Sequence, residues 1–191
     1  RIQHIQLCGN YGDPMTCAEI LPICHWFKEQ NPFMSIRIST NGGIGKPDHY
    51  RQLGKLGVEM VFGVDGASNE ILDLHRVNVR YDRVLRNMKE YMSECTSIHH
   101  EWQYILFDEN KCDVIDAVKQ AKELGIRVFY IRWPNGFADQ KEIPVFNFAG
   151  SFSHWLTPVT DEWKPWLDKH WNIAQDHTFT NLVNALEKIE P

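Results

Sequence analysis

The chain has 191 residues, a formal net charge of −5 and 43% hydrophobic residues, which suits one domain with a real core. With a pI near 6.0 and no sizeable basic patch, we expect neither nucleic acid nor an anionic membrane as a partner. No apolar run is long enough to cross a bilayer, no signal-like start is present, and the five cysteines form no CxxC pair, so we expect a cytoplasmic protein with reduced thiols.

Apolar runs of strand length recur along the first two thirds of the chain. They are rich in β-branched and aromatic residues and are punctuated by Gly, Asn or Asp, which favours buried strands over helical segments. The predicted strands are Ile2–Cys8, Met34–Ser39, Val58–Val64, Trp102–Phe107 and Ile126–Ile131.

Amphipathic stretches lie between these strands and predict helices. The first opens after Asp13-Pro14, with Asp as the cap and Pro at the first helical position. The predicted helices are Met15–Glu29, Asp48–Leu56, Tyr81–Tyr91 and Cys112–Leu124. Such alternation requires right-handed crossovers and a parallel sheet, either closed toward a barrel or open and doubly wound. Both architectures place chemistry at the carboxyl ends of the strands.

After residue 132 the alternation stops. Residues 133–158 are rich in Pro, Gly, Phe and Asn, and the segments Thr160–Trp171 and Phe179–Ile189 are expected to be helical. The tryptophans of this part suggest packing on the core rather than disorder. We therefore divide the chain into a βα core, residues 1–132, and a helical, Trp-rich C-terminal extension, residues 133–191, packed on it.

Polar residues and glycines follow the first two strands. Gly12 would let a ligand approach the backbone, and Asp13 can accept hydrogen bonds from a cation, although a tight turn with an Asp cap explains both residues too. The run Ser39-Thr40-Asn41-Gly42-Gly43 suits hydrogen bonding to a sugar or a carboxylate, and again a structural turn is the alternative.

The third strand ends in Val64-Asp65-Gly66, and His75-Arg76 follows about ten residues later. A strand-end carboxylate with a guanidinium that can grip a carboxylate is typical of ligand sites, and an ordinary ion pair between Asp65 and Arg76 is the alternative. Three successive strands carry such signals at the same end. Because independent turns would rarely produce this, we predict a ligand site there.

This ordered set of strand-end motifs resembles the radical S-adenosylmethionine (SAM) superfamily, especially its peptide-modifying and coenzyme-maturation branches. The resemblance covers roughly residues 1–132. It implies a partial (β/α)6, TIM-like barrel of parallel strands, of which this chain holds the second to the sixth. It also implies that SAM lies across the strand ends and chelates a 4Fe-4S cluster. Reduction, for example by a flavodoxin or a ferredoxin, would cleave SAM to a 5′-deoxyadenosyl radical, which abstracts hydrogen from a peptide or a small-molecule substrate.

The resemblance assigns roles to residues of the first two strand ends. Gly12 and Asp13 match the motif that binds the amino group of the SAM methionine, and Ser39 and Asn41 match positions near its ribose or carboxylate. Two departures occur, because Tyr11 stands where the family usually has a further glycine and because Asp13 replaces a glutamate.

The remaining matches lie on later strands. Asp65 and Arg76 match the strand-end acid and the arginine that meets the SAM carboxylate. Gln103 and Tyr130 are placed where the fifth and sixth barrel strands would approach ribose and adenine.

The family's cluster motif, CxxxCxxC, is absent. Cys8, Cys17 and Cys24 are too widely spaced for three thiolates to converge on one cubane, and we interpret them as buried, small hydrophobic residues. Neither the cysteines nor the histidines predict a metal site within the chain. Because the family's cluster loop follows the first barrel strand, the cluster ligands are expected upstream of Arg1.

Two alternatives remain open. The chain could be a barrel without a cluster that acts as a binding or structural module in a larger assembly. It could also be a doubly wound α/β protein that binds a nucleotide without iron.

Overall fold

The structure is a computed structural model that describes residues 2–9, 12–134, 141–146, 150–164, 167, 169–172, 183–184 and 187–188. Within these residues, six strands form one sheet in the order β1-β2-β3-β4-β5-β8. The first five run parallel, whereas β8 runs antiparallel to β5. Their bounds are β1 His4–Leu7, β2 Ser35–Thr40, β3 Glu59–Gly63, β4 Glu101–Ile105, β5 Val128–Arg132 and β8 Lys169–Asn172.

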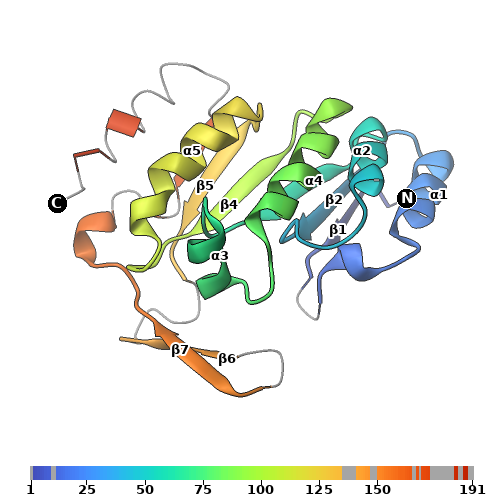
Figure 1. The fold of residues 1–191 in the computed structure, drawn as a ribbon. Helices are drawn as coiled ribbons and strands as arrows, with labels where there is room; N and C mark the ends of the chain where they lie inside the picture. Colours follow the sequence, from blue (N-terminus) through green and yellow to red (C-terminus); the bar gives the residue numbers. More distant parts are fainter. Residues whose placement is uncertain are drawn as a thin grey trace.

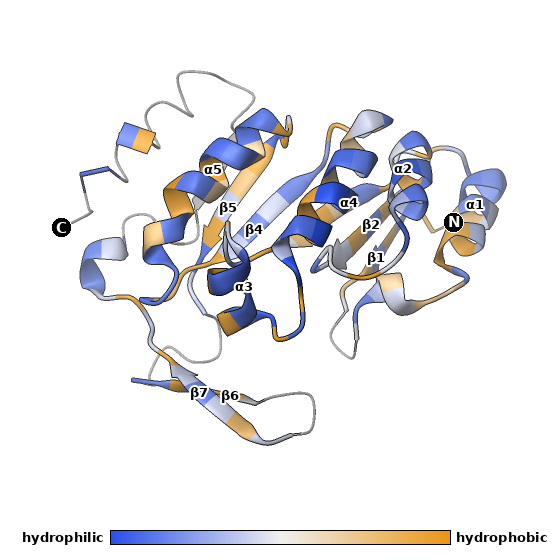
Figure 2. Cartoon of the chain, in the orientation of Figure 1, coloured by the Kyte–Doolittle hydropathy of each residue, from blue (hydrophilic) through white to orange (hydrophobic). Residues whose placement is uncertain are grey.

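The longer helices cover one face of this sheet (Figure 1) and turn their apolar sides toward it (Figure 2). Side chains along β2 point alternately to the two faces of the sheet. Ile36 and Ile38 are fully buried under the helices, whereas Arg37 and Ser39 lie on the opposite, open face. Helices on a single face favour a barrel wall over a doubly wound sheet. These helices are α1 Ile20–Gln30, α2 Pro47–Lys55, α4 Tyr81–Ser93 and α5 Val114–Glu123.

The five predicted parallel strands are confirmed, and the helices differ in detail. The expected first helix divides into a 3₁₀ turn, η1 Pro14–Thr16, and α1, which begins only at Ile20. A short helix that was not predicted, α3 Asn69–His75, follows the third strand, and Ser68 Oγ caps it by accepting from Ile71 N at 3.2 Å. A second 3₁₀ turn, η2 Lys111–Asp113, leads into α5. None of the described helices is long and apolar enough to cross a membrane.

The expectation of a helix over Thr160–Trp171 is wrong. The segment forms a 3₁₀ turn, η3 Asp161–Trp163, and then the strand β8, whose residues pair with β5 from Val128 opposite Asn172 to Ile131 opposite Lys169. The backbone groups at the edge of β5 outcompete a weak local helical preference. The helix expected over Phe179–Ile189 lies largely outside the described residues.

The extension also contains an unpredicted hairpin of β6, Ile143–Phe146, and β7, Phe152–Leu156. A small apolar cluster of Phe107, Ile143 and Leu156 attaches it to the end of β4. Next to this cluster, Asp108 N donates to Thr157 O at 2.8 Å. The hairpin therefore projects from the carboxyl end of the sheet (Figure 1).

A buried histidine just before β4, His100, makes the fold sensitive to acid. His100 Nδ1 accepts a hydrogen bond from Arg127 N at 3.1 Å, and burial lowers the pKa of the imidazole to about 4 from its usual 6.5. The unfolded chain takes up a proton near pH 6.5 and the folded chain does not, so this contribution to stability is complete above pH 6.5 and is lost as the pH falls toward 4.

We expect this group to lower the free energy of unfolding by about 2 kcal/mol at about pH 5 relative to neutral pH. Urea unfolding at both pH values measures it. The His100→Gln variant keeps an oxygen that can accept from Arg127 and should lose this part of the pH dependence, whereas His99→Gln, at an exposed position, should keep it. Identical pH dependence in all three proteins would contradict the assignment.

Candidate functional site

A pocket of about 340 Å³ lies on the open face of the sheet, at the carboxyl ends of β1 to β4. Its size is within the range of small-molecule sites. Asp13, Ser39, Asn41 and Arg76, which the sequence predicts as site residues, all line it, whereas Gly12 and Asp65 do not. The lining residues are Cys8, Gly9, Asp13, Ser39, Thr40, Asn41, Val61, Gly63, Arg76 and Gln103.

Asp13 ties the first two strand ends together at the rim of this pocket. Its Oδ1 accepts from Met15 N at 2.9 Å, which caps η1, and its Oδ2 accepts from Thr40 Oγ1 at 2.9 Å and from Asn41 N at 2.8 Å. Since a carboxylate has about four acceptor positions, one remains for a ligand. The structural role of Asp13 is thus established, and a ligand would add to it.

The glycines after β2 serve the turn and the packing rather than the pocket. Gly42 has a φ of +73°, and a Cβ on Gly43 would lie 2.7 Å from Val79 Cγ1. Asn87 Nδ2, on α4, donates to Gly42 O at 2.7 Å. Asn41 Oδ1 accepts from Gly43 N at 2.8 Å, so its amide nitrogen is the end that can donate to a ligand.

Asp65 and Arg76 form an ion pair of which only the arginine reaches the pocket. Asp65 is 2% exposed, and its Oδ2 accepts from Arg76 Nε at 2.8 Å and lies 2.8 Å from Nη2. Its Oδ1 accepts from Ile105 N at 2.8 Å. The guanidinium lies over Gly63, where an added Cβ would be 3.5 Å from Nη2. Asp65 therefore positions Arg76, which presents a positive charge to the pocket.

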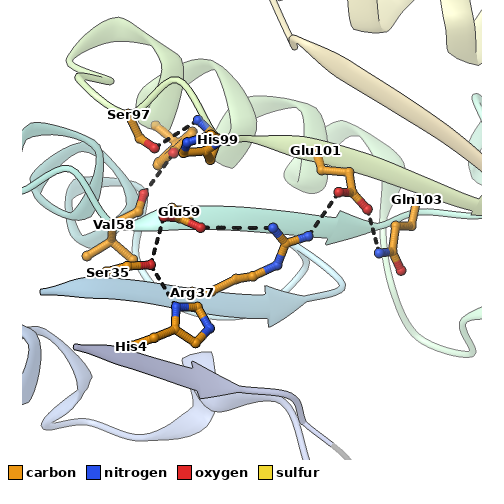
Figure 3. Close-up of polar contacts among 10 residues, drawn as sticks. His4, Ser35, Arg37, Val58, Glu59, Ser97, His99, Glu101 and Gln103 are labelled. Atoms are coloured by element: carbon orange, nitrogen blue, oxygen red, sulfur yellow. Dashed lines mark hydrogen bonds and ion pairs between the residues drawn. The ribbon is translucent and has the colours of Figure 1, made fainter. Parts of the chain in front are cut away.

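A row of hydrogen-bonded polar side chains crosses the open face one layer below the pocket (Figure 3). Arg37 on β2 donates to Glu101 on β4 at 2.9 Å and lies 3.9 Å from Glu59 on β3. Gln103 Nε2 donates to Glu101 Oε1 at 2.5 Å, and Gln103 also lines the pocket. The row contains His4, Ser35, Glu59, Arg37, Glu101 and Gln103. This row was not predicted, although the polar residues at every second position of β2 were a signal.

The cysteines do not form a cluster site in the described part of the chain. Cys24 is buried, as predicted, and burial raises the pKa of its thiol to about 11. The same prediction is wrong for Cys8 and Cys17, which are exposed because they follow the ends of β1 and η1. Among the described residues, no group of three His, Cys, Asp or Glu side chains could hold a metal ion. The described residues thus do not fit an iron–sulfur cluster.

Tyr130, on β5, lies directly beside Gln103 of β4 in the sheet register. It does not belong to the pocket lining. Of Gln103 and Tyr130, only Gln103 therefore lines the predicted site.

Several solved structures share the fold, although no family model and no curated protein matches the sequence. The chain superposes on SuiB of Streptococcus suis bound to S-adenosylmethionine with a TM-score of 0.58 and 16% identity, over 72% of this chain and 31% of SuiB. For TYW1 with a lysine-pyruvate adduct bound, the TM-score is 0.55 and the identity 9%, over 81% of this chain and 56% of TYW1.

For anSMEcpe with bound AdoMet and Cp18Cys peptide, the TM-score is 0.52 and the identity 14%, over 68% of this chain and 37% of that protein. The chain spans about a third of the length of SuiB. At these identities the likeness is one of fold, and the chain has the α/β fold, with five parallel strands, of proteins solved with SAM bound.

Proposed function

We propose that the chain is the greater part of the barrel of a radical SAM enzyme. The observation that carries the proposal is the strand-end pocket, in which five residues matched by the radical SAM resemblance meet. The shared fold with SuiB and anSMEcpe, both solved with SAM, supports it. The cluster thiolates would come from residues that precede Arg1, and a flavodoxin or a ferredoxin would supply the electron in the cytoplasm.

When bound to a reduced cluster, SAM supplies a carbon radical that abstracts hydrogen. The residues of this chain hold and orient SAM. Arg76, fixed by Asp65, binds the carboxylate, and the remaining acceptor position of Asp13 receives the amino group. Ser39 Oγ and Asn41 Nδ2 are left to bind ribose hydroxyls or the carboxylate.

A peptide is the favoured substrate. SuiB has been solved with its precursor peptide SuiA, and anSMEcpe with a Cp18Cys peptide. A small molecule remains the other substrate class that the resemblance implies.

A barrel without a cluster, acting as a binding or structural module, is the second candidate. The observation that favours it is that the described residues contain no set of three metal ligands. Anaerobic reconstitution of the longer protein with iron and sulfide, followed by dithionite and SAM, separates the two. Iron uptake with release of 5′-deoxyadenosine is expected for the enzyme. A protein that takes up no iron but still binds SAM would be the module.

The Arg76→Ala variant tests the residue assignment. Loss of a charged hydrogen bond is worth about 1.5 to 3 kcal/mol, so we expect SAM to bind about 10- to 100-fold more weakly. Titration calorimetry of the folded proteins measures this, and Arg86→Ala, at an exposed position on α4, serves as the matched control. Equal SAM affinities for both variants would contradict the role of Arg76.

A further inference from the structure

Arg132, the last residue of β5, is a cation on the open face without an anionic partner in the described part of the chain. Its Nη1 donates to Gln103 Oε1 at 3.4 Å, and its Cζ lies 5.4 Å from the centroid of the Tyr130 ring. Both partners are neutral. The other arginines of this face differ, because Arg37 lies next to Glu101 and Arg76 next to Asp65.

The position of Arg132 connects the pocket with the hairpin. Gln103, its hydrogen-bond partner, lines the pocket. Ile105, its neighbour in the sheet register, packs against the apolar cluster that attaches the hairpin. Val145 of β6 packs against the same cluster. A molecule bound beside the SAM pocket and under the hairpin would therefore meet this guanidinium.

Gln103 also separates the Arg132 guanidinium from the carboxylate of Glu101 in the polar row. Its Nε2 donates to Glu101, and its Oε1 accepts from Arg132, so the amide lies between the carboxylate and the guanidinium. The orientation of the amide is fixed at both ends. Glu101 is 7% exposed and already paired with Arg37, which leaves its charge balanced without Arg132.

A partly buried guanidinium without a counter-charge is unfavourable unless a ligand supplies one. Arg132 has five N–H donors, of which one is used within the described residues. The Tyr130 ring and Gln103 restrain it, so little conformational entropy is lost when the fork of donors meets a planar or tetrahedral oxyanion.

We propose that Arg132 binds a carboxylate or phosphate oxyanion of the second substrate, with Gln103 and Tyr130 as its positioning residues. The assignment of this oxyanion to the substrate rests on the proposed function, in which Arg76 already binds the carboxylate of SAM. The anion then belongs to the molecule that donates the hydrogen atom. This gives the substrate class: an acidic peptide, or a small molecule that carries a carboxylate or a phosphate.

The experiment titrates acetate and, separately, inorganic phosphate into the chain at low ionic strength and follows the arginine Nε–H signals by NMR. We expect a saturable shift of the Arg132 signal with at least one of the two anions. The anion that binds with the higher affinity indicates whether the site prefers a carboxylate or a phosphate. Arg132→Gln should abolish this binding, and Arg132→Lys, which keeps the charge without the fork, should weaken it about tenfold. Arg86→Gln, the exposed control on α4, should leave it unchanged.

Repeating the titration with SAM present separates this proposal from the proposed function. Anion binding that persists with SAM, together with unchanged SAM affinity in Arg132→Gln, supports a subsite for the second substrate. Anion binding in a chain that never binds SAM would leave the subsite standing and count against the radical SAM proposal. The subsite is overturned if neither anion shifts the Arg132 signal, if Arg132→Gln binds the anion as the original does, or if SAM displaces the anion.

Discussion

Replacing Asp65 with alanine is expected to lower the free energy of unfolding by about 3 kcal/mol, the lower end of the range for removing one partner of a buried ion pair. The carboxylate is almost fully buried, so its loss leaves Ile105 N without an acceptor and Arg76 without a counter-charge. The lower end applies because the Arg76 side chain is 34% exposed and water partly compensates its charge. Urea unfolding monitored by circular dichroism measures the change.

Two further variants make this test specific. Asp65→Asn keeps an oxygen for Ile105 N and should lose less stability than Asp65→Ala. Asp116→Ala removes a side chain that is 72% exposed and 3.9 Å from its lysine partner, and should change stability by less than about 0.5 kcal/mol. Similar losses for Asp65→Ala and Asp116→Ala would show that the buried pair contributes nothing beyond a surface charge.

Gly54→Ala should destabilise the fold by about 2 to 3 kcal/mol, the cost of overpacking a close helix contact. Gly54 lies on α2 where it packs on α4, and a Cβ there would lie far inside van der Waals contact of the Tyr91 carbonyl oxygen. A backbone atom cannot move aside as a side chain can, so the helices themselves must separate. Thermal and urea unfolding of the variant measure the effect.

Helix propensity alone predicts the opposite sign, because alanine favours a helix over glycine by about 1 kcal/mol. Lys55→Ala, at the exposed next position of α2, should be close to neutral and serves as the control. A Gly54→Ala protein more stable than the original would show that α2 and α4 are not in close contact.

The parallel strands could be predicted because each packs apolar side chains against the core, and such packing leaves a direct mark on composition. The expected strand Met34–Ser39 and the observed β2 differ by one residue at each end. The antiparallel β8 could not be predicted, since its partner β5 lies far away in the sequence and no local pattern encodes the pairing. The helix α3 was missed because it is short, although Ser68 was a visible capping signal.

The sequence predicted where the candidate site lies, but it did not predict which contacts its residues make. Parallel strands bring their carboxyl ends to one edge, so motifs after three of them had to gather there. What the sequence could not decide was whether Asp13 and Asp65 serve structure or a ligand. The structure gives both a structural partner, through Thr40 and Arg76 respectively. That Arg132 has no anionic partner among the described residues depends on distances across strands, which no sequence motif records.

The two edges of the sheet are not equivalent. β8 covers the edge of β5, whereas β1 pairs only with β2 among the described residues. The strand β1 has the sequence His4-Ile5-Gln6-Leu7, without the lysine, proline or bulge that commonly protects an edge, and the exposed Ile2 precedes it. In a preparation of these residues alone, β1 is therefore a template for self-association, and the solubility of the protein depends on what occupies that edge.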